Sequence, residues 1–209
     1  IRAGMTWLRT NQATVNSLNV FPIPDGDTGT NMCLTMQSAW DEVAKLQDGS
    51  SISEVVHAVA HGALMGARGN SGVILSQLWR GFSRTLDKSV QMDAALFAHS
   101  LAEARDTAYR GVVRPVEGTI LTVSKDIAEA ADQALAQGAS STLHILEAIV
   151  PAADASVERT QGLNPVLAEA GVVDAGGKGL FFLLEGMLRA AKGEPLDEAL
   201  VNVQPLTEL

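Results

Sequence analysis

The stretch Asn19-Val-Phe-Pro-Ile-Pro-Asp25-Gly-Asp27-Thr28-Gly29-Thr30-Asn31-Met32 joins a loop punctuated by Pro and Gly to the start of a helical pattern. Its two prolines remove backbone donors and stiffen the approach to the loop. Asp25 and Asp27, separated by one Gly, can turn their oxygens toward a single point. Oxygen ligands on a short loop suit Mg2+, which proteins commonly hold with one or two carboxylates and substrate phosphates. The stretch therefore predicts a cation site at the start of a helix.

The first helical residues of the same stretch indicate an anion site beside the cation. Thr28, Gly29, Thr30 and Asn31 offer hydroxyl, amide and free N–H groups at a helix start, where phosphates commonly bind. Adjacent metal and phosphate sites indicate a nucleotide. The same run also fits a plain turn with an N-cap, which leaves that alternative open. A calcium loop does not fit, because Thr and Met stand where such a loop needs Gly and Glu.

Three further Gly-rich turns each open onto a helical pattern. In chain order, their candidate residues are Arg68, Asn70, Ser71 and Gly72; Gly118 and Thr119; and Asp174, Ala175, Gly176 and Gly177. The first turn could bind a phosphate or form a close helix–helix corner, and Arg68 could reach a phosphate oxygen or solvate that corner. The second turn could contact a phosphate, or Thr119 could simply cap the helix. The third turn allows the backbone to approach a flat ligand such as adenine, and Asp174 could cap the helix or bind the nucleotide.

Composition favours an all-α fold. Aromatic residues make up only 4% of the 209 residues and Ala and Leu are abundant, whereas strands favour aromatic and β-branched residues. No strand or internal repeat is expected. We expect helices over residues 1–18, 28–46, 92–110, 142–160 and 180–191, with others starting near Ser51, Val73, Ile120 and Pro165. The simplest arrangement places the four turns at one end of a helical bundle, around one ligand.

Charge and cysteine content exclude several classes of partner. The net charge of -9 argues against nucleic acid and anionic membranes, since both need a basic surface. The single cysteine, Cys33, excludes an internal disulfide and is expected in the core. No signal peptide or integral membrane segment is recognisable, so a cytoplasmic location is expected. His57 and His61 have zinc-pair spacing but no third ligand, which favours a packed pair.

Four motifs span nearly the whole chain: Asn19-Val-Phe-Pro-Ile-Pro-Asp-Gly-Asp-Thr-Gly-Thr-Asn-Met, Gly66-Ala-Arg-Gly-Asn-Ser-Gly-Val-Ile-Leu-Ser-Gln, Pro115-Val-Glu-Gly-Thr-Ile-Leu and Gly171-Val-Val-Asp-Ala-Gly-Gly. Together they resemble the nucleotide-binding domain of the dihydroxyacetone kinase family (DAK2, DhaL-like), and more closely the N-terminal kinase domain of bacterial fatty acid kinase. The resemblance implies an eight-helix antiparallel barrel over residues 1–192, with ATP and two Mg2+ ions at one mouth. A linker over residues 193–209 would lead to further domains of a longer chain, of which this sequence would be a fragment.

The resemblance also implies roles for the motif residues. Asp25 and Asp27 would hold Mg2+ and, with Arg68, form the catalytic group. Asn19 falls near the place where dihydroxyacetone kinases have a third metal-binding Asp, and would be a weaker, neutral ligand. Residues Thr28 to Asn31, Asn70 to Gly72, Gly118 and Thr119 would line the phosphates, and Asp174 to Gly177 would lie near the nucleoside.

The function implied is Mg-assisted phosphoryl transfer from ATP to a fatty acid carboxylate, giving an acyl phosphate and ADP. In fatty acid kinases a separate carrier protein, of the DegV type, presents the acyl chain, and the parent chain would be a homodimer through its other domains. A carboxylate with a pKa near ~4–5 is already ionised at neutral pH and needs no general base, whereas a hydroxyl acceptor would gain from one. Only His57 and His61 are nearby candidates for a base.

Three alternatives stay open. The first is a dihydroxyacetone (glycerone) kinase subunit, although the neutral Asn19 and the Phe-Pro-Ile-Pro run lean against it. The second is a haloacid-dehalogenase-type phosphatase, whose nucleophile motif resembles Asp25-Gly-Asp27-Thr28. That motif ends a buried strand, which Pro22 and Pro24 would break. The third is a nucleotide-binding regulatory module without catalysis.

Overall fold

The computed structural model describes residues 1–196, and this part of the chain is entirely helical, as the sequence predicts. The predicted linker over residues 193–209 falls mostly outside the described residues. The helices are α1 (Arg2–Thr10), α2 (Gln12–Ser17), α3 (Thr28–Val43), α4 (Ile52–Met65), α5 (Gly69–Thr85), α6 (Ala94–Gly111), α7 (Ile120–Ala136), α8 (Thr142–Leu163), α9 (Pro165–Ala170) and α10 (Ala175–Lys192). Because no strand precedes the acidic loop, the phosphatase alternative loses the central strand that it requires.

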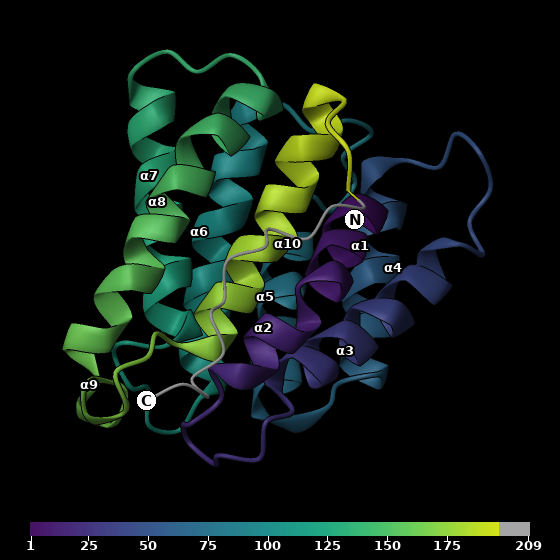
Figure 1. Ribbon diagram of the computed structural model, residues 1–209. Helices are drawn as coiled ribbons and strands as arrows, with labels where there is room; N and C mark the ends of the chain where they lie inside the picture. Colours follow the sequence, from purple (N-terminus) through teal and green to yellow (C-terminus); the bar gives the residue numbers. More distant parts are fainter. Residues whose placement is uncertain (197–209) are drawn as a thin grey trace.

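Successive long helices run in alternating directions (Figure 1). Each helix from α3 to α8 packs against the next, α10 packs against α8 and α1, and α1 packs against α3, so the neighbour contacts close into a ring. Helices α3, α5, α7 and α10 all begin at the same end of this ring, which we call the mouth end. The four turns singled out in the sequence therefore gather at one end, as expected.

Side-chain caps set several helix starts. The predicted capping box is present: Ser51 Oγ accepts from Glu54 N at 3.2 Å, and the Glu54 carboxylate accepts from Ser51 N at 2.7 Å. These hydrogen bonds lower the pKa of Glu54. Asn164 caps α9 and Pro165 is its first residue, as predicted. Helix α8 is capped by Ser141, one residue before the expected Thr142.

The expected helix over residues 1–18 is wrong in one respect, because it breaks at Asn11 into α1 and α2. Asn11 is buried, and its side-chain amide donates to the Trp7 carbonyl at 2.9 Å. The apolar period continues through the break, so it gives no sign of the interruption. Helix α10 also begins at Ala175 rather than near Leu180, because Asp174 caps it.

Glycine allows two helices to cross at backbone distance. A Cβ on Gly81 of α5 would lie 2.4 Å from the Glu103 carbonyl oxygen of α6. The buried core includes Cys33 of α3, as predicted, and burial raises the pKa of its thiol to about 11. Within residues 1–196, no helix has both the length and the apolar character needed to cross a bilayer.

The ring surrounds an apolar cavity of about 410 Å³ that is partly open to solvent. Its walls come from most of the long helices and include Val56, Leu75, Leu78, Phe82, Ile127 and Leu183. Trp79 of α5 also lines it. The cavity was not expected from the sequence, because helical periodicity predicts which side chains point inward and not how completely they fill the space.

Candidate functional site

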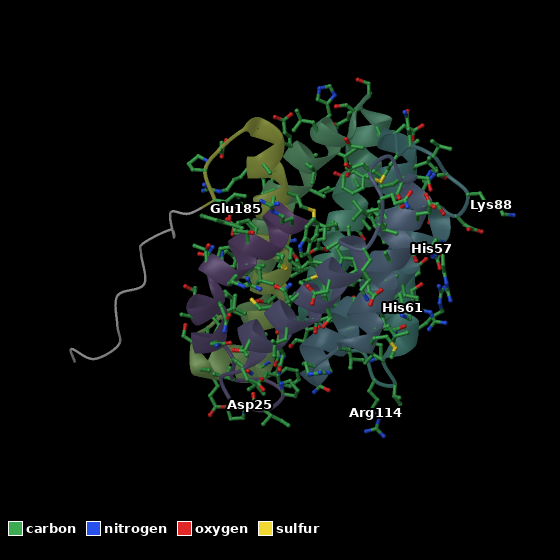
Figure 2. All side chains as sticks on the ribbon, turned by 90° about the vertical axis from the view of Figure 1, so that its right-hand side faces the viewer. Asp25, His57, His61, Lys88, Arg114 and Glu185 are labelled. Atoms are coloured by element: carbon green, nitrogen blue, oxygen red, sulfur yellow. The ribbon has the colours of Figure 1, made fainter. Side chains whose placement is uncertain are left out.

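The mouth end brings together segments that are far apart in the chain. In Figure 2, Asp25 and Arg114 lie at the same end of the molecule, and Lys88 lies toward the opposite end. The start of α5 abuts the start of α3, since a Cβ on Gly69 would lie 2.5 Å from Asn31 Nδ2. Arg68 N also donates to Thr35 Oγ1 of α3 at 3.2 Å. The acidic loop and the second Gly turn are therefore neighbours.

The acidic loop presents two carboxylates without partners. Asp25 is exposed, and Asp27 directly precedes α3 without capping it through its side chain. Within the described residues, neither carboxylate makes a hydrogen bond or an ion pair. Both are therefore available to a cation or another ligand.

Asn19 ties the two sides of the acidic loop together. Its side chain is nearly buried, at 7% exposure. Its Oδ1 accepts from Asp27 N and Thr28 N, both at 3.1 Å, and its Nδ2 donates to the Ile23 carbonyl at 2.9 Å. The amide oxygen that the resemblance assigns to a metal is thus engaged with two backbone N–H groups, which gives Asn19 a structural role in the loop.

Helix α2 holds the first turn of α3. Thr30 Oγ1 accepts from Gln12 Nε2 at 2.9 Å and Asn16 Nδ2 at 3.0 Å, and Thr30 N donates to Asn16 Oδ1 at 3.1 Å. Thr28 and Gly29 are buried behind this contact. The sequence analysis did not single out Gln12 and Asn16, although two amides four residues apart before the loop are a usable signal.

The first turn of α5 differs from the other helix starts at the mouth end. Side chains accept from N–H groups at the starts of α3, α7 and α10. At the start of α5, Arg68 makes no side-chain cap, and within residues 1–196 no group accepts from the N–H of Gly69, Asn70 or Ser71. Asn70 and the Arg68 side chain are exposed beside these N–H groups. An oxyanion would satisfy them.

The turn between α6 and α7 satisfies its own polar groups. Gly118 has a positive φ of 74° and donates to Thr122 Oγ1 at 2.8 Å, and Thr119 caps α7 by accepting from Leu121 N. The Glu117 carboxylate accepts from Thr122 Oγ1 at 2.7 Å and Tyr109 Oη at 3.1 Å. Burial and the nearby Glu117 charge raise the pKa of Tyr109. This network has no sequence signal, because its members are spaced by the turn and not by a helical period.

Asp174 is the cap of α10, one of the two roles that the sequence left open. Its side chain is only 6% exposed, and its Oδ2 accepts from Gly177 N at 2.7 Å. Burial raises the pKa of the Asp174 carboxyl to about 6. Gly177 packs against α7, where a Cβ would lie 2.8 Å from Val123 Cγ2. The space beside this glycine is therefore filled by protein.

The histidine pair lies away from the mouth end, on the side of α4 (Figure 2). His57 Nε2 is 3.6 Å from Asp87 Oδ1, and both side chains are at least half exposed. Within the described part of the chain, no group of three or more His, Cys, Asp or Glu side chains could hold a metal ion. A bound ion would need ligands of other kinds as well, such as other protein oxygens, phosphate oxygens or water.

Together these features define a class of protein: an all-helical domain that gathers Gly-rich turns, two unpartnered carboxylates and an uncapped helix start at one end. The sequence matches the DAK2 domain over residues 22–189, and the chain belongs to that family.

Among related proteins, the chain is 49% identical over 201 residues to Protein YloV of Bacillus subtilis (strain 168), covering 96% of this chain and 36% of that protein. It is 47% identical over 196 residues to an uncharacterized protein of Staphylococcus aureus (strain USA300), covering 94% of this chain and 35% of that protein. The chain thus spans about a third of the length of these relatives. The dihydroxyacetone kinase of C. freundii has a similar fold, with a TM-score of 0.59 at 21% identity over 90% of this chain and 34% of that one.

Proposed function

We propose that this chain is the ATP-binding domain of a kinase that transfers the γ-phosphoryl group to the carboxylate of a fatty acid presented by a separate carrier protein. One observation carries the proposal: the uncapped first turn of α5 packs against Asn31 in the first turn of α3, and the acidic loop with its unpartnered carboxylates directly precedes that turn. Neighbouring anion and cation sites suit a metal-bound polyphosphate. Membership of the DAK2 domain family and a fold shared with a dihydroxyacetone kinase support a kinase.

The residues at the mouth end divide the work of binding. The N–H groups of Gly69, Asn70 and Ser71 would donate to phosphate oxygens, and the exposed Arg68 would add positive charge. Nucleoside contacts would come from the starts of α7 and α10, which adjoin each other. Phosphoryl transfer depends mainly on positioning and on neutralising charge, so this division is sufficient for the reaction class.

The acidic loop fits Mg2+ shared with the substrate. Two carboxylates, Asp25 and Asp27, are too few for a site made of protein alone, but Mg2+ is commonly held by one or two carboxylates together with phosphates. When bound, the ion would supply neutralisation of the developing charge on the phosphate oxygens. Asn19 would keep the loop folded so that both carboxylates stay close to the α5 turn.

The carboxylate acceptor is inferred from two carboxyl groups of the mouth end that are already engaged. Glu117 accepts from Tyr109 and Thr122, and Asp174 caps α10, so neither is free to take a proton from an acceptor. A carboxylate is already ionised and needs no proton removed, whereas a hydroxyl acceptor gains from a general base.

Binding of Mg-ATP to single and double variants tests the site. Calorimetry should show that Asp25→Ala and Asp27→Ala each weaken Mg-ATP binding at least about tenfold, since each removes a charged ligand. Asp48→Ala is the matched control, because this exposed carboxylate lies in the turn between α3 and α4 at the other end. A double variant, Asp25→Ala with Asp27→Ala, that binds Mg-ATP like the wild type would refute the site.

Transfer assays with the full-length protein test the acceptor. We expect ATP-dependent phosphorylation of a fatty acid loaded on its carrier protein. Phosphorylation of dihydroxyacetone instead would favour the alternative raised by the similar fold. Mg-ATP binding without transfer to either acceptor would favour a regulatory module.

A further inference from the structure

Exposed apolar side chains gather at the mouth end. Of the ten large apolar side chains that are exposed within residues 1–196, only that of Val90 lies toward the opposite end, in the turn between α5 and α6. The other nine lie in the loops of the mouth end or within two helical turns of it. Single exposed apolar residues are normal on a protein surface, but a collection of them in one region marks a site of interaction.

We propose that the apolar side chains of the mouth loops form a docking surface for the protein that presents the carboxylate acceptor. This surface, the apolar rim, comprises Ile23, Met65, Val113, Val116, Leu163 and Val166. These residues come from four separate segments: the acidic loop, the end of α4, the turn between α6 and α7, and the junction of α8 and α9. The rim therefore surrounds the region where the phosphoryl group would be transferred, and the inference rests on the proposed function.

The site at the mouth end is open to water in this chain alone, because Asp25, Arg68 and Asn70 are all exposed. A polyphosphate and an acyl phosphate both react with water, so a kinase has to exclude water from its site during transfer to prevent hydrolysis. The rim encircles these exposed side chains. A protein that docks on the rim therefore covers the site at the moment when it delivers the acceptor.

Positive charge on the rim defines the chemistry of the partner. Arg114 follows the most exposed rim residue, Val113 at 98%, and projects from the mouth end (Figure 2). Within residues 1–196, the Arg114 side chain makes no hydrogen bond or ion pair, and the Arg68 guanidinium donates only to the Ala67 carbonyl next to it. A partner with acidic side chains around an apolar face fits this surface. A second copy of this chain fits poorly, because a symmetric contact would bring unpaired arginines together.

The rim suits a partner that binds and leaves. Its residues are interrupted by polar ones, as Val113 and Val116 are by Arg114, whereas permanent interfaces are more continuously apolar, like a domain core cut in half. ATP and ADP also have to pass through the region that the rim surrounds. A domain held permanently over the rim would block that exchange, whereas a carrier protein that leaves after each transfer would not.

Transfer kinetics of the full-length protein with a fatty-acid-loaded carrier of the DegV type test the rim. Val113→Asp places a charge at its most exposed position, so we expect the KM for the loaded carrier to rise about tenfold while kcat and Mg-ATP affinity stay within about twofold. Met65→Gln, in another segment of the rim, should raise the KM about threefold. The matched control is Val90→Asp, a residue 73% exposed at the opposite end, which should leave the KM within about twofold of the wild type.

Hydrogen exchange separates the rim from the proposed function. In the full-length protein, the backbone amides of residues 112–117 should exchange more slowly when the loaded carrier is added, and those around Val90 should not change. Such protection without any phosphoryl transfer would overturn the proposed function and still support the rim as the docking surface. Transfer in which Val113→Asp and Val90→Asp have the same KM, or exchange at residues 112–117 that the carrier does not slow, would overturn the inference.

The same variants decide between the carrier and other occupants of the rim. A second copy of the protein is the occupant if Val113→Asp, without carrier, lowers the mass measured by analytical ultracentrifugation. A further domain of the longer protein is the occupant if residues 112–117 exchange equally slowly with and without carrier. A membrane is the occupant if phosphatidylglycerol vesicles bind the wild type and not Val113→Asp. Each of these three results would overturn the inference.

Discussion

Replacing Asn19 with Ala removes three hydrogen bonds at once from the acidic loop. The amide accepts from Asp27 N and Thr28 N and donates to the Ile23 carbonyl, in a nearly buried position. At a net 0.5–1.5 kcal/mol for each bond, the expected destabilisation is about 2–4 kcal/mol. For a domain of this size that lowers the melting temperature by roughly 4–16 °C. Circular dichroism during thermal unfolding measures the change.

The variant Asn19→Asp distinguishes a loop tie from a metal ligand. Asp keeps both acceptors but places a carboxylate oxygen against the Ile23 carbonyl, so we expect partial destabilisation and no gain in Mg2+ affinity. A metal ligand would behave differently, because a carboxylate would bind Mg2+ more tightly than an amide does. The matched control is Asn11→Ala, a buried asparagine that donates to Trp7 and should lower stability without changing Mg-ATP affinity. The reasoning fails if Asn19→Ala melts like the wild type while its Mg2+ affinity falls.

Further variants test the packing and the electrostatics of the fold. Gly81→Ala should lower the free energy of unfolding by about 1–2 kcal/mol, because the new methyl meets the α6 backbone. Gly162→Ala is the matched control: it has no neighbour within 4 Å and should raise the free energy of unfolding by roughly 0.5–1 kcal/mol. Val56→Leu extends a side chain into the apolar cavity and should raise the free energy of unfolding, measured in urea, by up to about 1 kcal/mol. A lower free energy of unfolding would show that the cavity has no room for the added methylene. Glu54→Ala should destabilise the protein above the unfolded pKa of Glu54, because its lowered pKa means that the ionised form stabilises the native state. That difference should vanish as the pH falls through the folded pKa, and a pH-independent difference would contradict the capping box.

Local signals predicted much of the fold. The Ser51 capping box and the Asn164-Pro165 start lie within a few residues of the groups that they satisfy, so the sequence alone identifies them. The break at Asn11 escaped, because its cause is a side-chain hydrogen bond that leaves the apolar period intact. The cavity escaped for a similar reason, since filling depends on the distances between helices and not on which residues face inward.

The candidate site, like the fold, could be predicted only where residue types alone mark a feature. The Gly turns and the acidic pair could be found, because turns and paired carboxylates are marked by residue type. The duties of Asn19 and Asp174 could not be assigned, because a polar side chain before a helix can bind either a ligand or the backbone N–H groups of that helix, and only the folded loop shows which. A polar residue that looks ready to bind a ligand in the sequence can be fully occupied by backbone once the chain has folded.

The alternating directions of the long helices also make the helix dipoles act only at short range. The N-termini of α3, α5, α7 and α10 lie at the same end as the C-termini of α4, α6 and α8, so their opposite partial charges, each about half an elementary charge, largely cancel at a distance. The chain as a whole has a net charge of -9, which repels anions at long range. An anion therefore gains attraction only once it is within about one turn of a helix start whose N–H groups are uncapped, as they are in α5.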